Sequence, residues 1–197
     1  MFLLKKSFKF SLACVALLCA SSCEIIKPVE DAIITDSSIV YTIKKGTHYS
    51  SHNNLKQVNT SFMQFEVTFD SSAVYTTTDP LNQGDLNKLY GFADCSSLHQ
   101  MNSARFGWRW FENRLELHAY TYNNSSRRSE FITSVEIEKP YTYEIEVKDK
   151  EYVFRLDNQE VTLPRHCSGT AAGYQLYPYF GGDEVAPHDI TIRIKEL

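Results

Sequence analysis

Residues that can exchange protons or hold a carboxylate occupy alternate positions in both halves of the stretch Ser103 to Asn124. Histidine and tyrosine serve as general acids and bases, and arginine donates in bidentate fashion to carboxylates. The polar set consists of Arg105, Arg109, Glu116, His118, Tyr120 and Tyr122. Apolar side chains, with Phe106 and Trp108 among them, fill the positions in between. This alternation predicts an antiparallel hairpin that turns at Glu112-Asn113, with one face in the core and a polar face on which function is to be sought.

Turn signals separate further short alternating segments along the chain, whereas no segment keeps a helical period beyond a turn or two. We therefore expect an all-β domain, and a two-sheet sandwich rather than a closed barrel, because the strands differ in length and long loops interrupt them. Besides the 103–124 hairpin, the expected strands are 39–45, 61–70, 74–77, 88–93, 130–137, 141–149, 151–157, 160–163, 174–180 and 189–195.

The first 22 residues do not belong to this domain. A basic start and the short apolar run Phe10 to Leu18 predict a secretory signal, since about 20 apolar residues are needed to span a bilayer. Ala20 and Ser22 suit an ordinary signal peptidase that would cut at the same bond. The segment also resembles a bacterial lipoprotein signal with Cys23 as the acylated residue, although Ala20 stands where such signals usually carry leucine.

The lipoprotein resemblance implies a protein that a lipid at Cys23 anchors in the bacterial cell envelope, at the outer membrane. We expect residues 1–22 to be the signal peptide, residues 23–38 to be a tether, and residues 39–197 to form the β-sandwich.

The formal charge of −4 becomes more negative once the signal is removed, because the signal carries three lysines and no acid. This balance argues against a nucleic-acid partner. It favours a neutral or cationic ligand, unless arginines are focused in a cleft.

Cys95 and Cys167 are the two cysteines that neither the signal nor the lipid uses. Two thiols in an exported protein usually pair, so we expect a disulfide. The alternative is a zinc site in which both thiols join His99 and His166, although the spacing matches no standard finger.

The C-terminal run 173–197, the segment RFGWRW and the hairpin YEIEV…YVFRLDNQEV resemble concanavalin A-like jelly-roll domains. The resemblance is strongest to small lipoproteins and glycan-active proteins of Bacteroidetes. It implies two stacked antiparallel sheets, of which the concave one carries the ligand groove or the catalytic groups.

If the 103–124 hairpin and the 174–180 strand share the concave sheet, their outward side chains form one surface. Sugar rings need flat aromatic platforms and bidentate polar groups, and this surface supplies both. We therefore expect a polysaccharide or oligosaccharide to bind there, the alternative being a sheet surface with no ligand. The expected glycan-binding residues are Arg105, Arg109, Glu116, His118, Tyr120, Tyr122, Gln175, Tyr177 and Tyr179.

Catalysis on the same face is a further alternative. Polysaccharide lyases of this fold combine a Tyr or His acid and base with an Arg and an amide that neutralise a uronate carboxylate. The matching residues would be His118, Tyr120, Arg109 and Gln175. The alginate-lyase signatures are missing apart from Arg128-Ser129-Glu130, and the Glu-x-Asp-x-x-Glu motif of jelly-roll glucanases does not occur. We therefore assign no catalytic residue and favour a binding protein over an enzyme, with a structural or protein-binding lipoprotein as the remaining alternative.

Gly181-Gly182 precedes three acidic residues that could complete a calcium shell, namely Asp183, Glu184 and Asp189. The alternative is a plain turn with capping acids. No other cofactor is expected.

Overall fold

The computed structural model describes residues 37–197, which form twelve β-strands and two short 3-10 helices. The strands are β1 (Ile39–Ile43), β2 (Gln57–Thr60), β3 (Phe62–Phe69), β4 (Asn87–Ala93), β5 (Ser103–Phe111), β6 (Arg114–Asn123), β7 (Ser126–Val135), β8 (Tyr141–Lys148), β9 (Glu151–Leu156), β10 (Gln159–Pro164), β11 (Ala171–Leu176) and β12 (Ile190–Glu196); the helices are η1 (Ser71–Ala73) and η2 (Pro80–Gly84).

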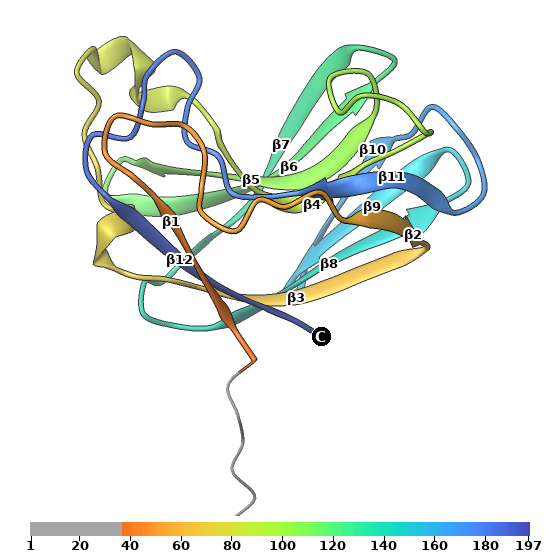
Figure 1. Cartoon of the computed structure of the whole chain (residues 1–197), viewed down its shortest axis with the longest axis horizontal. Coiled ribbons are helices and arrows are strands. Elements are labelled where there is room, and N and C mark those ends of the chain that lie inside the picture. The colour runs from red at the N-terminus through yellow and green to blue at the C-terminus, as the bar shows by residue number, and fades with distance from the viewer. Residues whose placement is uncertain (1–36) are drawn as a thin grey trace, which may run out of the picture. The chain divides into compact units, whose positions relative to one another are not determined.

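These strands build two six-stranded sheets that pack face to face (Figure 1). One sheet has the order β1-β12-β3-β8-β9-β10 and the other the order β2-β11-β4-β5-β6-β7, and the neighbouring strands pair antiparallel. The expected all-β, two-sheet sandwich is confirmed.

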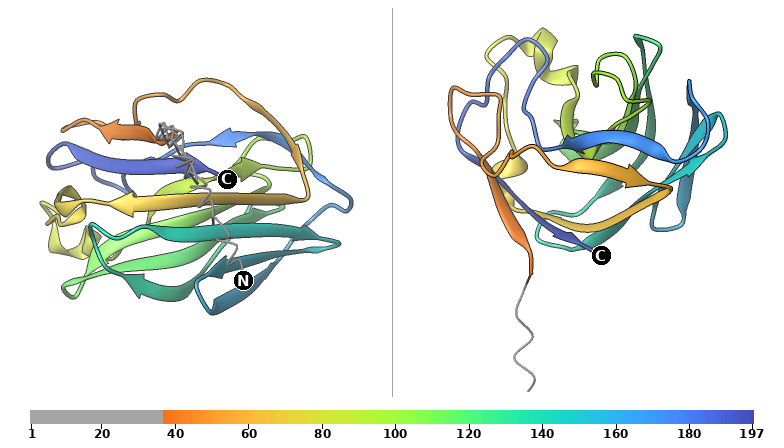
Figure 2. Two further views of the ribbon diagram at one scale, coloured as in Figure 1. Left: turned by 90° about the horizontal axis from the view of Figure 1, so that it is seen from below. Right: turned by 45° about the vertical axis from the view of Figure 1, so that its right-hand side comes forward.

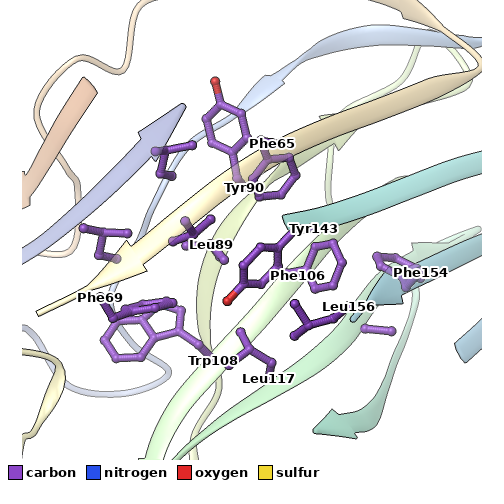
Figure 3. Packing of buried hydrophobic residues seen from close by; sticks show 14 of the residues in the cluster. Phe65, Phe69, Leu89, Tyr90, Phe106, Trp108, Leu117, Tyr143, Phe154 and Leu156 are labelled. Atoms are coloured by element: carbon purple, nitrogen blue, oxygen red, sulfur yellow. The ribbon is translucent and has the colours of Figure 1, made fainter. Parts of the chain in front are cut away.

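The core between the sheets is made of the apolar halves of the alternating strands, and aromatic rings dominate it (Figure 3). Phe106 and Trp108 are fully buried, as the alternation in β5 predicts. The ring of Phe65 stacks on that of Tyr143 with 5.5 Å between centroids, and Phe106 meets Tyr143 edge-on at 5.0 Å. Since full burial of one large apolar side chain stabilises by roughly 1.5–3 kcal/mol, this cluster fixes how the two sheets stack.

Two tight turns align β5, β6 and β7 as an up-and-down meander. Glu112 and Asn113 both have positive φ, as a two-residue type I′ turn requires, and so do Asn124 and Ser125 at the next turn. The β6–β7 hairpin and η2 rise on the same side of this sheet, as the right-hand view of Figure 2 shows from another direction. That side is the polar face of the sheet.

Three segments differ from the sequence expectations. Residues 74–77 form no strand, because they lie between η1 and η2, whose N-terminal N–H groups are capped by the carboxylates of Asp70 and Asp79. The polar loop after β1 ends in the additional strand β2. The strand expected to reach residue 180 ends at Leu176, two residues before Pro178, which has no N–H to give to a ladder.

Residues 1–36 lie outside the described residues, and with them the expected signal peptide, Cys23 and most of the tether. Within residues 37–197, no helix has the length and apolar character needed to cross a membrane.

Candidate functional site

The strand register places the polar side chains of β5, β6 and β7 in rows across the sheet. Arg105 lies opposite Tyr120, which lies opposite Ser129. One step along the face, His118 lies opposite Phe131. Because directly opposed residues of antiparallel strands share a face, these side chains all belong to the outer surface of the sheet.

A cleft of about 560 Å³ opens over one end of this face. Six tyrosines line it, namely Tyr49, Tyr120, Tyr122, Tyr174, Tyr177 and Tyr179. The basic side chains at its wall are those of Lys88, Arg105 and Arg127, with His99 beside them. No aspartate or glutamate is among the described residues that line it. The cleft is therefore aromatic and cationic, although the whole chain carries a formal charge of −4.

Arg105 is buried in the wall of the cleft, with 8% of its surface exposed. Its guanidinium carbon lies 5.6 Å from the centroid of the Tyr120 ring. Within residues 37–197 its Nε has no hydrogen-bond partner, and no ion pair of Arg105 is found. Burial lowers the pKa of this guanidinium to about 10, so it is still charged at neutral pH. An unpaired buried cation is costly, and this makes Arg105 the most unusual group of the site.

Lys88 supplies a second cation at the same place. Its Nζ lies 5.6 Å from the Tyr120 ring centroid and 5.7 Å from that of Tyr179, and it donates a hydrogen bond to the Gly181 carbonyl. Burial and the nearby charge of Arg105 lower the pKa of Lys88 to about 8. A small rise above neutral pH therefore removes one positive charge from the cleft.

His99 and Tyr174 meet across the cleft wall, with 2.9 Å between His99 Nδ1 and Tyr174 Oη. Burial and the charge of Arg105 lower the pKa of His99, so the imidazole is neutral at pH 7. Neither residue was among the expected glycan-binding residues, and His99 was expected only as a possible zinc ligand. Counting the outward positions of β11 from Tyr174 rather than from Gln175 would have found the tyrosine, but nothing in the sequence places the loop of His99 over the sheet.

A second group of polar residues further along β5 and β6 forms a closed ionic cluster around Glu116. Arg109 Nε lies 2.8 Å from Glu116 Oε2, Arg114 Nε lies 3.0 Å from Oε1, and His118 Nε2 lies 3.4 Å from Oε2. Glu116 is 3% exposed. Burial alone would raise the pKa of Glu116, but the hydrogen bond and charge of Arg109 outweigh it and hold the pKa below its usual value. Glu116 is thus an ionised partner of arginines.

Burial and the charge of Arg109 also lower the pKa of His118. Three of the four residues of the lyase alternative consequently fall into two environments. His118 and Arg109 contact Glu116, while Tyr120 lies beside Arg105 and Lys88.

Gln175 and Tyr177 lie differently from the expected outward set. Gln175 is paired with the core residue Phe92, and its Nε2 donates to the Gly91 carbonyl at 2.8 Å. The ring of Tyr177 lies 5.9 Å from that of Tyr41. Both residues reach the cleft wall, but the Gln175 amide and the Tyr177 ring are already engaged in these contacts within the protein.

The expected calcium site is not supported. Glu184 accepts hydrogen bonds from the backbone N–H groups of Thr78 and Asp79, which lowers its pKa to about 2, and Asp189 pairs with Lys44 at 2.7 Å. Among residues 37–197, three metal-ligating side chains converge only at Asp94, Cys95 and Cys167. Glu184 therefore caps backbone N–H groups and Asp189 forms an ion pair, as in the alternative of a plain turn with capping acids.

Cys95 and Cys167 are joined by a disulfide, with 5.8 Å between their Cα atoms. Their sulfurs are therefore not free to ligate zinc. The bridge ties the loop that follows β4, which carries His99, to the segment between β10 and β11.

No protein-family model matches the chain, and no curated protein matches it. Solved structures with a similar fold include the alginate lyase AlyC3, at 10% identity and a TM-score of 0.58 over 80% of this chain and 72% of that chain. A non-specific endo-β-1,3(4)-glucanase from family GH16, SCLam, aligns at 9% identity and a TM-score of 0.53 over 80% and 69%. The alginate lyase vAL-1 from Chlorella virus aligns at 10% identity and a TM-score of 0.50 over 81% and 82%.

The chain has the concanavalin A-like jelly-roll fold. At such low identity the similarity establishes the architecture and no activity.

Proposed function

We propose that this protein binds a glycan in the cleft over β4, β5, β6 and β11. The observation that carries the proposal is the lining: six tyrosines, with amide and cationic groups between them, around a volume of about 560 Å³. The apolar faces of sugar rings stack on aromatic rings, while the hydroxyl rim needs hydrogen-bonding groups at the edges. The side chains of Asn53, Asn54 and Gln100 offer such groups at the cleft wall.

The comparisons support this proposal without deciding it. The fold is shared with two alginate lyases and a glucanase, all of which act on polysaccharides according to their names. The position of the tyrosine cleft, on the outer face of the curved sheet, is also where ligands lie in the fold that the sequence resembles.

Binding is tested with a polysaccharide panel and the purified protein, followed by calorimetry on the polymers that bind. Replacement of Tyr122 and Tyr174 by alanine together should weaken binding about tenfold, because each stacked ring contributes roughly 0.5–1.5 kcal/mol. Phe62→Ala is the matched control, since Phe62 is an exposed aromatic on the other sheet. Failure of every polymer to bind, or equal weakening by the control, would refute the proposal.

A lyase is the second candidate, and the His99–Tyr174 contact favours it. A neutral imidazole 2.9 Å from a phenol, beside the cation Arg105, could abstract a proton next to a carboxylate. Incubation with several uronic-acid polymers would reveal new absorbance of the unsaturated product. Loss of this absorbance in His99→Gln, with binding retained, would establish catalysis, and its absence from the native protein with all polymers would exclude it.

The cellular location follows from residues outside the described part of the chain and stays a prediction. We propose that Cys23 carries lipid and holds the domain at the cell envelope. Metabolic labelling with a fatty acid should mark the native protein and not Cys23→Ser. Equal labelling of both would contradict the anchor.

A further inference from the structure

We propose that the cleft selects glycans with negatively charged substituents, carboxylate or sulfate, and that Arg105 is the residue that binds the charged group. The inference rests on the proposed glycan-binding function and names its ligand class.

The first observation is that Arg105 has no ion-pair partner among the described residues, whereas Arg109 and Arg165, which are also largely removed from solvent, each have one. Arg109 pairs with Glu116, and the side chains of Arg165 and Asp94 pair at 2.7 Å with no exposed surface. Arg105 is more than nine-tenths buried, and its Nε has neither an acceptor nor contact with solvent. A buried guanidinium without an anion is costly to folding, so an anion brought by a ligand gains the full benefit of pairing.

The second observation is the sign of the charges around the cleft. Lys88, Arg105 and Arg127 line it, and none of the described residues that line it is an acid. Asp85 and Asp183 influence Lys88 electrostatically but do not line the cleft. Three cations concentrated in one cleft of an acidic protein create a local positive potential, which raises the local concentration of anions.

The third observation is the geometry around the guanidinium. Tyrosine side chains surround Arg105, those of Tyr120, Tyr122, Tyr174 and Tyr179, and their hydroxyl groups can donate hydrogen bonds to a bound anion. A planar guanidinium binds a carboxylate or sulfate through two parallel hydrogen bonds, while the rings contact the sugar that carries it. A neutral sugar offers the rings the same stacking but leaves the guanidinium without its anion.

The test compares matched polymers that differ only in charge. One pair is a polyuronate and its carboxyl-reduced form, and the other is a sulfated galactan and its desulfated form. We expect the purified protein to bind at least one acidic member about tenfold or more tightly than its neutral counterpart. Whether the polyuronate or the sulfated polymer binds assigns the anion, and binding by both supports the shared chemistry.

Arg105→Met should abolish this preference by weakening binding of the acidic polymer about tenfold or more, without weakening binding of its neutral form. Arg105→Lys keeps the charge without the planar fork. Its preference for the acidic polymer should lie between those of the native protein and of Arg105→Met, which keeps the test valid if the methionine variant folds poorly. Arg128→Met is the control, because Arg128 is an exposed cation on β7 that does not line the cleft.

Equal affinity for acidic and neutral members, or unchanged preference in Arg105→Met, would overturn the inference while leaving glycan binding intact. Absence of binding by all four polymers would overturn the proposed function along with it.

Discussion

Arg105 and Arg109 lie on the same face of β5, four residues apart, and differ in whether an acid pairs with them. Arg109 donates to Glu116 at 2.8 Å and to the Gly84 carbonyl at 2.6 Å. Arg105 faces the tyrosine cleft with its Nε unpartnered. One strand thus carries an arginine that stabilises the fold and an arginine that is free to bind a ligand.

This difference predicts opposite effects of the same substitution on stability. Arg109→Met leaves Glu116 buried without its closest cation, so we expect the free energy of unfolding to fall by about 1.5–3 kcal/mol. Arg105→Met removes an unpaired buried charge, so the free energy of unfolding should stay the same or rise. Urea unfolding at pH 7 measures both. A loss at Arg105 as large as that at Arg109 would mean that Arg105 has a structural role.

The arrangement of β5 and β6 could be predicted from the sequence because it is local. Alternation sets the two faces, and a two-residue turn at Glu112-Asn113 fixes each opposed pair, so that Arg109 must face Glu116. The ion pair between them was therefore derivable, although the sequence analysis treated both residues as ligand-binding groups.

The rest of the site depends on contacts between distant segments. Lys88 comes from β4 and His99 from the following loop, and only the folded sheet order brings them to Tyr174 on β11. Gln175 reaches the cleft wall but is paired with the core residue Phe92, which the sequence could not show because strand pairing between distant segments is not encoded in local alternation.

The low pKa of Lys88 predicts that binding of an acidic glycan weakens as the pH rises. Lys88 titrates near pH 8 in the surroundings of Arg105, Arg127, Asp85 and Asp183. Below pH 8 the ammonium is charged and attracts the anion, and above it the attraction is lost, so affinity should drop roughly fivefold between pH 7 and pH 9. Calorimetry at several pH values measures this. Lys88→Met should bind weakly at both pH values and Lys88→Arg tightly at both, whereas a native profile that persists in Lys88→Met would assign the titration elsewhere.

The buried pair of Asp94 and Arg165 predicts that the folded protein loses stability at acid pH. Asp94 also accepts a hydrogen bond from the Tyr152 hydroxyl at 2.7 Å. Burial alone would raise the pKa of Asp94, but Arg165 and the other donors outweigh it and lower that pKa. The pKa of Asp94 is lower in the folded protein than its unfolded value of about 3.9. Its contribution to the free energy of unfolding is therefore complete above that value and is lost as the pH falls through the folded pKa.

Asp94→Asn should therefore cost about 3–5 kcal/mol at pH 7, since Arg165 is left buried without an anion. Below pH 4 the native protein should lose stability more steeply than the variant. Unfolding curves from pH 7 to pH 3 test this, and parallel curves for the two proteins would show that Asp94 does not cause the acid dependence.

The disulfide between Cys95 and Cys167 predicts a joint effect on stability and on the cleft. It closes a loop of 72 residues, so Cys95→Ser with Cys167→Ser should lower the free energy of unfolding by about 4 kcal/mol. The His99 loop also loses its covalent tie, so glycan affinity should fall as well. Reduction of the native protein should reproduce both effects. Unchanged affinity in a destabilised variant would mean that the other contacts of this loop suffice to position His99.

The exposed ring of Phe131, which does not line the cleft, predicts that the glycan site extends beyond the cleft onto β7. It is 50% exposed on β7, where its ring meets that of His118 edge-on with 5.5 Å between centroids. An exposed ring beside a sugar groove can stack on one further residue of a long glycan, which contributes roughly 0.5–1.5 kcal/mol. Phe131→Ala should therefore weaken long glycans about threefold to tenfold, leave short oligosaccharides unaffected and leave the melting temperature unchanged. Phe62→Ala serves again as the control, being an exposed aromatic on the other sheet. Equal weakening of the binding of short and long glycans would mean that Phe131 belongs to the cleft site itself. No weakening at all would mean that the glycan site does not extend past Tyr120.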